Sequence, residues 1–136
     1  MTFANGAKVM TAYFGPWTWA LGVMKAVPSQ QSVCSQFGSA FSPPEEDSKV
    51  GIALATLGLA PLNALRHPAE RGTCGWHIWG GEILSQDPEF FQPLHVHHLV
   101  QHCPAIIPYL ALAPGWRILL APSQLEVWHD PSLLNV

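Results

Sequence analysis

The chain has 136 residues, of which 49% are hydrophobic and only 11% are charged. This is the length of one domain, and the composition excludes intrinsic disorder, because such a chain has enough apolar surface to build a core. The formal net charge of −3 and the scattered positions of the six Lys and Arg residues argue against a surface that binds nucleic acid. With so few charges, part of the apolar surface is expected to stay exposed, which favours a protein partner.

The N-terminal segment from Val9 to Met24 is uncharged and mostly apolar. It is shorter than the ~20 residues that span a bilayer, and Gly15-Pro16 interrupts it. We therefore expect strand-like or mixed core segments over 8–14 and 17–27 rather than a signal or an anchor. A cytoplasmic protein without a membrane partner is the expected outcome.

The three cysteines are odd in number, and Cys34, Cys74 and Cys103 lie 40 and 29 residues apart. This spacing fits neither a paired disulfide framework nor a metal-binding knuckle, so we expect reduced thiols. Cys74, close to His77 in sequence, is the best candidate for a nucleophile, although a buried, inert thiol is the simpler interpretation. The sequence has no Gly-x-Ser-x-Gly turn and no phosphate loop, so we expect neither an enzyme nor a cofactor.

The middle of the chain opens with a segment over 28–48 that is rich in Ser, Gln, Gly and Pro and is predicted to be a loop. The apolar run over 50–59 predicts a buried strand or a short helix, which periodicity cannot separate. Residues 75–79, closed by Gly80-Gly81, predict a strand that runs into a turn, and we expect Trp76 and Trp79 on one face.

The last third of the chain mixes helix and strand signals. Asp87 before a proline and a glutamate predicts a helix start over 88–91. The apolar spacing over 94–103 predicts a helix, and Pro104 predicts a second short helix over 105–110. Two strands over 116–121 and 125–128 are predicted to form a hairpin. The whole pattern predicts a small single α+β domain over 1–136, with short antiparallel strands and two or three short helices.

Three histidines, His95, His98 and His102, fall at i, i+3 and i+7 on one face of the predicted helix. Imidazoles at this spacing could supply zinc ligands. The sequence nevertheless lacks the His-Glu-x-x-His pattern that places a general base beside the metal. We therefore expect a solvated face and no metal site, and a metal-dependent enzyme stays open as an alternative function.

Two segments combine the residue types that protein interfaces favour. The run 45–47 is the only dense charge in the chain, and the loop from Gly80 to Glu89 places three acidic residues beside an aromatic side chain. The six tryptophans are expected mostly in the core, although such side chains also anchor interfaces. The candidate binding residues are Glu45, Glu46, Asp47, Trp79, Glu82, Asp87 and Glu89.

Several short motifs between Arg66 and Asp130 are specific in combination. They are Arg66-His67-Pro68, Gly75-Trp76 followed by Gly81-Glu82, Asp87-Pro88-Glu89-Phe90-Phe91, Pro93-Leu94-His95-Val96, Pro108-Tyr109-Leu110, Pro114-Gly115-Trp116-Arg117 and Val127-Trp128-His129-Asp130. Together they resemble the bacterial polymorphic-toxin immunity proteins of family thirty-three and its relatives. The first motifs look like that family's Arg-x-Pro, Asp-Ser-Gly-Trp and Gly-Glu signature, from which this sequence departs at Thr73-Cys74 and Ile78. Residues 1–65 carry no such resemblance.

The resemblance implies a small cytoplasmic immunity protein that binds a cognate toxin and neutralises it by protein–protein interaction. The candidate binding residues would then contact the toxin. The acidic balance suits a basic, nuclease-type partner, because complementary charge raises the association rate. A stand-alone regulatory or scaffold module of the same fold is a further alternative, and a homo-oligomer is compatible with each of these functions.

Overall fold

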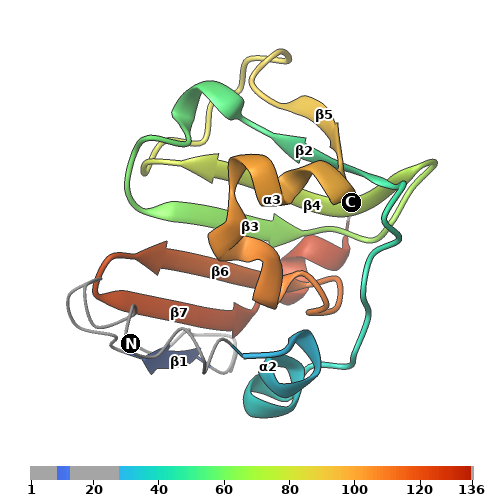
Figure 1. The fold of residues 1–136 in the computed structure, drawn as a ribbon, viewed down its shortest axis with the longest axis vertical. Coiled ribbons are helices and arrows are strands. Elements are labelled where there is room, and N and C mark those ends of the chain that lie inside the picture. The colour runs from blue at the N-terminus through green and yellow to red at the C-terminus, as the bar shows by residue number, and fades with distance from the viewer. Residues whose placement is uncertain (1–8, 13–27, 136) are drawn as a thin grey trace.

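A computed structural model describes residues 9–12 and 28–135 of the chain. Seven strands form one sheet in the order β1-β7-β6-β3-β4-β2-β5 (Figure 1). All neighbours pair antiparallel except β2 and β4, which run parallel. The strands are β1 (Val9–Ala12), β2 (Lys49–Ile52), β3 (Leu62–Arg66), β4 (Thr73–Gly80), β5 (Gln92–His95), β6 (Trp116–Ala121) and β7 (Gln124–His129).

Short helices join these strands, so the predicted α+β class is confirmed. Two are α-helices and four are turns of 3-10 helix in the part of the chain described. They are α2 (Gln30–Phe37), η2 (Leu54–Thr56), η3 (Val96–His98), α3 (Leu99–His102), η4 (Pro104–Tyr109) and η5 (Pro131–Leu134). The predicted segment 17–27, with Trp17 and Trp19, lies outside the described residues.

The prediction of a loop throughout 28–48 is wrong over its first part, because α2 lies there. The Ser29 hydroxyl accepts a hydrogen bond from the Ser32 N–H and caps the helix N-terminus. Gly38 ends the helix in the left-handed region, and its N–H donates to the Cys34 carbonyl. The buried residues Val33, Cys34 and Phe37 share one helical face, so a short apolar stripe was present within a polar composition.

Some predictions for the C-terminal third of the chain are confirmed, and others are wrong. The hairpin of β6 and β7 and the short helix η4 are confirmed. The predicted helix start at 88–91 is wrong: the Asp87 side chain accepts from the Glu89 N–H and its carbonyl from the Phe90 N–H, which closes a turn that goes no further. The predicted helix over 94–103 is wrong at its start, because Gln92–His95 pair with β2 as a strand.

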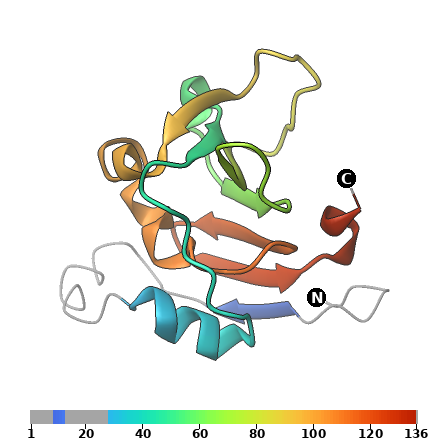
Figure 2. The same ribbon diagram turned by 90° about the vertical axis from the view of Figure 1, so that its right-hand side faces the viewer.

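The two faces of the sheet are covered differently. Figure 2 shows α3 and η4 on one side of the sheet and η5 on the other. The larger core lies under α2, α3 and η4 and includes Trp76 and Ile78. A smaller cluster lies on the opposite face and includes Trp79, Leu65 and Leu133. Trp76 and Trp79 therefore face opposite sides, contrary to prediction, because residues three apart in a strand cannot share a face.

Arg66 is buried at 4% exposure and ties three segments together. Its Nε donates to the Cys74 carbonyl at 2.9 Å, and its Nη1 donates to the carbonyls of Ser42 at 2.7 Å and Leu112 at 2.6 Å. The guanidinium lies 5.6 Å from the Trp76 ring centroid, and Trp76 Nε1 donates to the Leu110 carbonyl. Burial lowers the pKa of Arg66. The first family-like motifs therefore hold the fold together.

Candidate functional site

The loop between β4 and β5 rests on the smaller hydrophobic cluster. Phe90 and Phe91 at its end are half-buried and pack against this cluster. The Phe91 ring centroid lies 6.2 Å from that of Trp79, in an edge-on arrangement. At the start of the loop, the Gly80 N–H donates to the Thr56 hydroxyl at 2.8 Å. Both ends of the loop are thus fixed to the body of the protein.

The middle of this loop exposes apolar and acidic side chains together. Ile83 is 80% exposed, and four of the seven exposed large hydrophobic residues in the described part of the chain lie on this loop or on the adjoining 54–59 segment. That segment adjoins both ends of the loop: a Cβ on Gly81 would lie 3.3 Å from Leu59 Cδ1, and the Leu54 N–H donates to Gln92 Oε1. The surface, called here the loop patch, comprises Leu54, Leu59, Glu82, Ile83, Leu84, Asp87 and Glu89.

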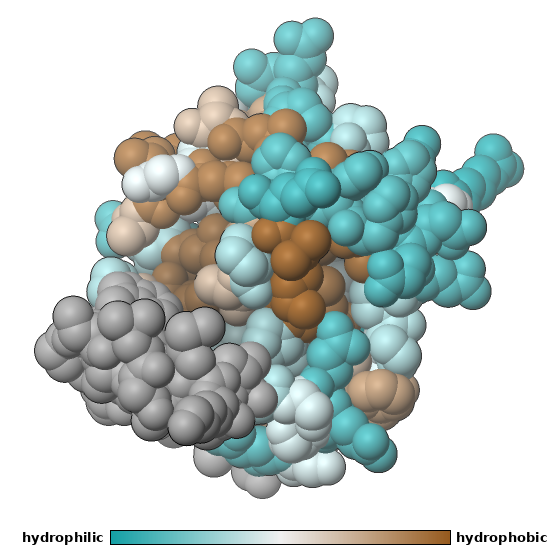
Figure 3. Space-filling model, in the orientation of Figure 1, coloured by the Kyte–Doolittle hydropathy of each residue, from teal (hydrophilic) through white to brown (hydrophobic). Residues whose placement is uncertain are grey.

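Hydrophobic surface is concentrated at the end of the molecule that carries the loop patch. Figure 3 shows brown surface over the upper left, where η2 and the following turn lie, next to hydrophilic surface at the top. An apolar area bordered by charge has the composition of a contact surface. The loop patch is therefore the candidate binding site.

One predicted contact residue, Trp79, is buried in the structure, so its prediction as a surface contact is wrong. Trp79 is 3% exposed and lies beneath the loop in the smaller cluster, so its side chain is not available on the surface. Glu82, Asp87 and Glu89 are exposed. The predicted contact residues include the acidic residues of this loop but not Ile83 and Leu84. The available signal was two adjacent apolar residues in an otherwise polar loop.

The acidic run Glu45-Glu46-Asp47 is exposed on a second, separate surface. It lies in the turn that leads into β2 at Lys49, whereas the loop patch adjoins the other end of that strand. The Ser48 hydroxyl donates to the Glu45 carbonyl at 2.7 Å, and the His97 N–H donates to the Glu46 carbonyl. The predicted contact residues are therefore not one continuous site.

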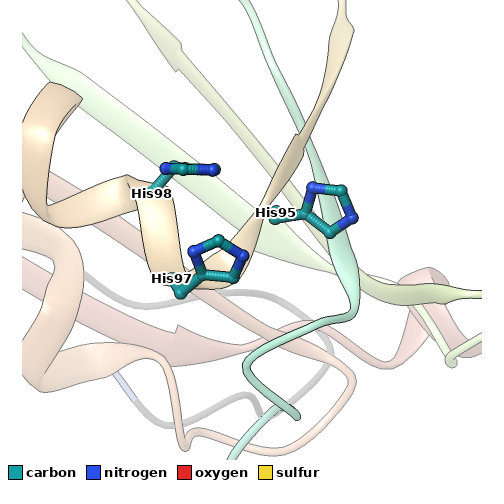
Figure 4. Close-up of side chains that lie close together, drawn as sticks. All are labelled: His95, His97 and His98. Atoms are coloured by element: carbon teal, nitrogen blue, oxygen red, sulfur yellow. The ribbon is translucent and has the colours of Figure 1, made fainter.

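The histidines gather differently from the prediction. His95 ends β5 and His98 ends η3, so His95, His98 and His102 do not share a helix face, and His102 lies apart on α3. The structure brings together His95, His97 and His98, one ring nitrogen of each lying within 4.8 Å of the others (Figure 4). Three imidazoles this close can share a metal ion.

A second pair of histidines, His67 and His77, lines a shallow cleft of about 270 Å³. Their ring centroids are 5.3 Å apart, and each Nδ1 lies within hydrogen-bond distance of a carbonyl, of Leu133 and Gly75 respectively. Burial lowers the pKa of His77, the Gly75 carbonyl opposes that shift and His67 adds to it. The His77 ring packs between Gly51 and Phe91. These contacts give the pair a packing role.

The three cysteines are free, in line with the prediction of unpaired thiols, and all three are buried, although burial was predicted only for Cys74. Cys74 lies in the larger core, on the opposite face of β4 from His77, so these two residues cannot act as a nucleophile and its base. Burial raises the pKa of Cys103 to about 11 and also raises the pKa of Cys34. A thiol is reactive as its thiolate, so burial makes both of these side chains inert.

The fold and this surface define a small α+β module whose exposed features suit contact with another macromolecule. The family model of the Imm33-like domain matches residues 29–130, and the chain belongs to the Imm33-like domain family of immunity proteins. No curated protein and no solved structure matches the chain. Among the residues that the structure describes, no helix is long and apolar enough to cross a membrane.

Proposed function

We propose that the protein binds a cognate bacterial toxin in the cytoplasm of the producing cell and neutralises it by direct contact through the loop patch. Membership of an immunity-protein family supports the role. The observation that carries the choice of surface is the loop patch itself, where Ile83 is 80% exposed and Leu84 is 42% exposed between acidic residues.

The physical case rests on how interfaces gain free energy. A few anchor side chains that become fully desolvated supply most of the affinity, and a polar rim sets the orientation and the rate of encounter. Ile83, Leu84 and Leu59 are exposed in the free protein and could be buried on binding. Fixed loop ends reduce the conformational entropy that binding removes.

The partner is proposed to be basic around its active site, as a nuclease-type toxin would be. The loop patch carries Glu82, Asp87 and Glu89 and has no Lys or Arg among its own residues. Opposite charges on the two partners accelerate association and reject partners of the same charge. No reaction is required of the immunity protein, so the proposed mechanism is steric and electrostatic obstruction.

The alternative functions have less support in the structure. The metal-dependent enzyme rested on a helix face of His95, His98 and His102, and these residues do not form one face. A stand-alone regulatory module would use the same kind of surface, so only the identity of the bound partner separates it from an immunity protein. A toxin gene next to the gene for this chain would favour the immunity function.

The anchor residues provide the first test. The double variant Ile83→Ser and Leu84→Ser is expected to weaken binding of an inactive form of the neighbouring toxin by about 30-fold, or about 2 kcal/mol, because two anchors are lost. The change should lie mainly in the dissociation rate, measured by biolayer interferometry. Val100→Ser, at a 60% exposed apolar residue on α3, is the matched control and should bind as the wild type does. Equal dissociation rates for the double variant and the wild type would place the interface elsewhere.

The two acidic surfaces are separated by charge reversal. Changing Glu82, Asp87 and Glu89 to Lys is expected to slow association by about tenfold at low salt, since these charges border the anchors. The same reversal at Glu45, Glu46 and Asp47 should slow association by a smaller factor and leave dissociation unchanged, because only long-range steering is lost. A larger effect from the 45–47 variant would move the proposed interface to that surface.

A further inference from the structure

We propose that His95, His97 and His98, called here the histidine cluster, form a binding site for a divalent transition-metal ion of the zinc class. The ion would have three imidazole ligands and one open coordination position. This inference does not rest on the proposed function, because the cluster shares no residue with the loop patch. It starts from a geometric fact: one nitrogen from each ring lies within 4.8 Å of the other two.

The limit of 4.8 Å on the nitrogen separations is wider than the spacing of ligand atoms around a bound ion. Tetrahedral zinc with bonds of about 2.0–2.1 Å to nitrogen holds its ligand atoms about 3.3 Å apart. The His97 and His98 ring centroids are 4.1 Å apart, and His95 and His97 are stacked with centroids at 5.4 Å (Figure 4). His97 is exposed and the other two rings are half-buried. Binding of the ion would therefore require side-chain rotations that bring the three nitrogens to ligand spacing.

The backbone that carries the three rings is fixed on both sides. His95 pairs with Lys49 at the end of the β2–β5 ladder, and the Val96 N–H donates to the Ser48 carbonyl at 2.9 Å. The His97 N–H donates to the Glu46 carbonyl at 3.1 Å. The buried side chains of Val96 and Leu99 hold the following turn against the core. A fixed backbone reduces the ordering that metal binding would otherwise require.

The ring nitrogens of the cluster are available to a ligand. Among the described residues, no hydrogen bond is formed by any of these three rings, whereas the Nδ1 atoms of both His67 and His77 lie beside backbone carbonyls. An imidazole without an internal partner is free to offer a lone pair. The cluster differs in this respect from the packed histidine pair in the cleft.

The chemistry of the ligands selects the class of ion. Imidazole nitrogen suits zinc, copper and nickel, whereas magnesium and calcium prefer oxygen ligands. The exposed acidic run 45–47 lies next to the histidine cluster, since the Glu46 carbonyl accepts a hydrogen bond from the His97 N–H. The negative charge of this run favours binding of a cation. Lys49 pairs with His95 across the β2–β5 ladder, and its positive charge acts against this attraction. The balance of these formal charges is negative.

Three protein ligands leave a fourth position for water or for a donor atom of another molecule, because zinc is usually four-coordinate. The exposure of His97 places that position at the surface. The predicted helix face would have included His102 in place of His97. In the structure His97 takes the place of His102, because His95 is the last residue of a strand and the following turn, which carries His97 and His98, is a 3-10 helix.

The test uses the full-length chain without an affinity tag, after removal of bound metal with a chelator. Titration with zinc chloride, followed by isothermal titration calorimetry, is expected to show one equivalent bound. His97→Ala should weaken binding by about 100-fold or more, since even residues that only orient metal ligands change affinity 10–100-fold. His102→Ala removes an exposed histidine outside the cluster and should leave the affinity unchanged.

A second measurement separates the histidine cluster from the cysteines. The absorption spectrum of the protein loaded with cobalt(II) should lack the charge-transfer band of a thiolate ligand, since all three cysteines are buried elsewhere. His95→Gln should weaken binding as His97→Ala does, with an unchanged circular dichroism spectrum in both variants. Less than half an equivalent of zinc, equal affinities for His97→Ala and wild type, or a thiolate band would each overturn the proposal.

Discussion

Replacing Arg66 by methionine is expected to lower the free energy of unfolding by about 3 kcal/mol. The substitution keeps most of the side-chain volume but removes the donors to the carbonyls of Cys74, Ser42 and Leu112. Each buried acceptor left without a partner costs about 1–3 kcal/mol, and removal of the buried charge offsets part of that loss. Urea denaturation followed by circular dichroism measures the difference.

Arg71→Met is the matched control, because Arg71 is exposed in the turn before β4. Its unfolding midpoint should stay within the error of the wild type, as is usual for surface substitutions. Arg66→Lys should recover only part of the stability, since one ammonium group cannot reproduce the geometry of a guanidinium that donates to several carbonyls. A midpoint for Arg66→Met equal to that of the control would show that these hydrogen bonds contribute nothing net.

Arg66 and Trp76 also explain what the family motifs do. Both side chains donate to the Leu110 carbonyl, which joins β3 and β4 to the segment after η4. The residues that carried the resemblance thus include buried parts of the fold, such as Arg66 and Trp76. They also include Glu82, Asp87 and Glu89, which are exposed in the loop patch.

Sequence signals predicted best those elements that are formed by residues close together in the chain. The hairpin of β6 and β7 has a two-residue turn at Pro122-Ser123, and the alternating burial along β6 follows from strand geometry. The short α2 helix was missed although Ser29 and Gly38 are typical capping residues. The polar composition of the surrounding segment outweighed those two signals.

Long-range pairing explains why the predicted helix over 94–103 is wrong at its start. Leu94 and His95 begin the predicted helix over 94–103 but pair with Val50 and Lys49 of β2, which lies far earlier in the chain. That pairing moves His95 onto a strand end and replaces the predicted histidine face with the cluster of His95, His97 and His98. The candidate surface was partly predictable, because exposed acidic residues follow from sequence. The burial of Trp79 beneath Phe91 depends on contacts between elements that no local pattern encodes.

Gly75→Ala is expected to destabilise the protein by about 3 kcal/mol or more. Gly75 has φ of 93°, in the region that side chains with a Cβ rarely adopt, and an added Cβ would overlap the His67 carbonyl oxygen. The His67 N–H donates to the Gly75 carbonyl at 2.9 Å, so the two backbones cannot separate without breaking that bond. Backbone strain of about 1–3 kcal/mol and overpacking of similar size both oppose the substitution.

Gly72→Ala separates these two causes. Gly72 also has a positive φ, of 72°, but an added Cβ there would meet no heavy atom within 4 Å. Its cost should therefore be the conformational one alone, about 1–2 kcal/mol, and the difference between the variants measures the overlap with His67. Equal urea midpoints for the two variants would mean that the chain relaxes freely at Gly75. A larger loss for Gly75→Ala would show that the His67 backbone lies too close to this position for any side chain.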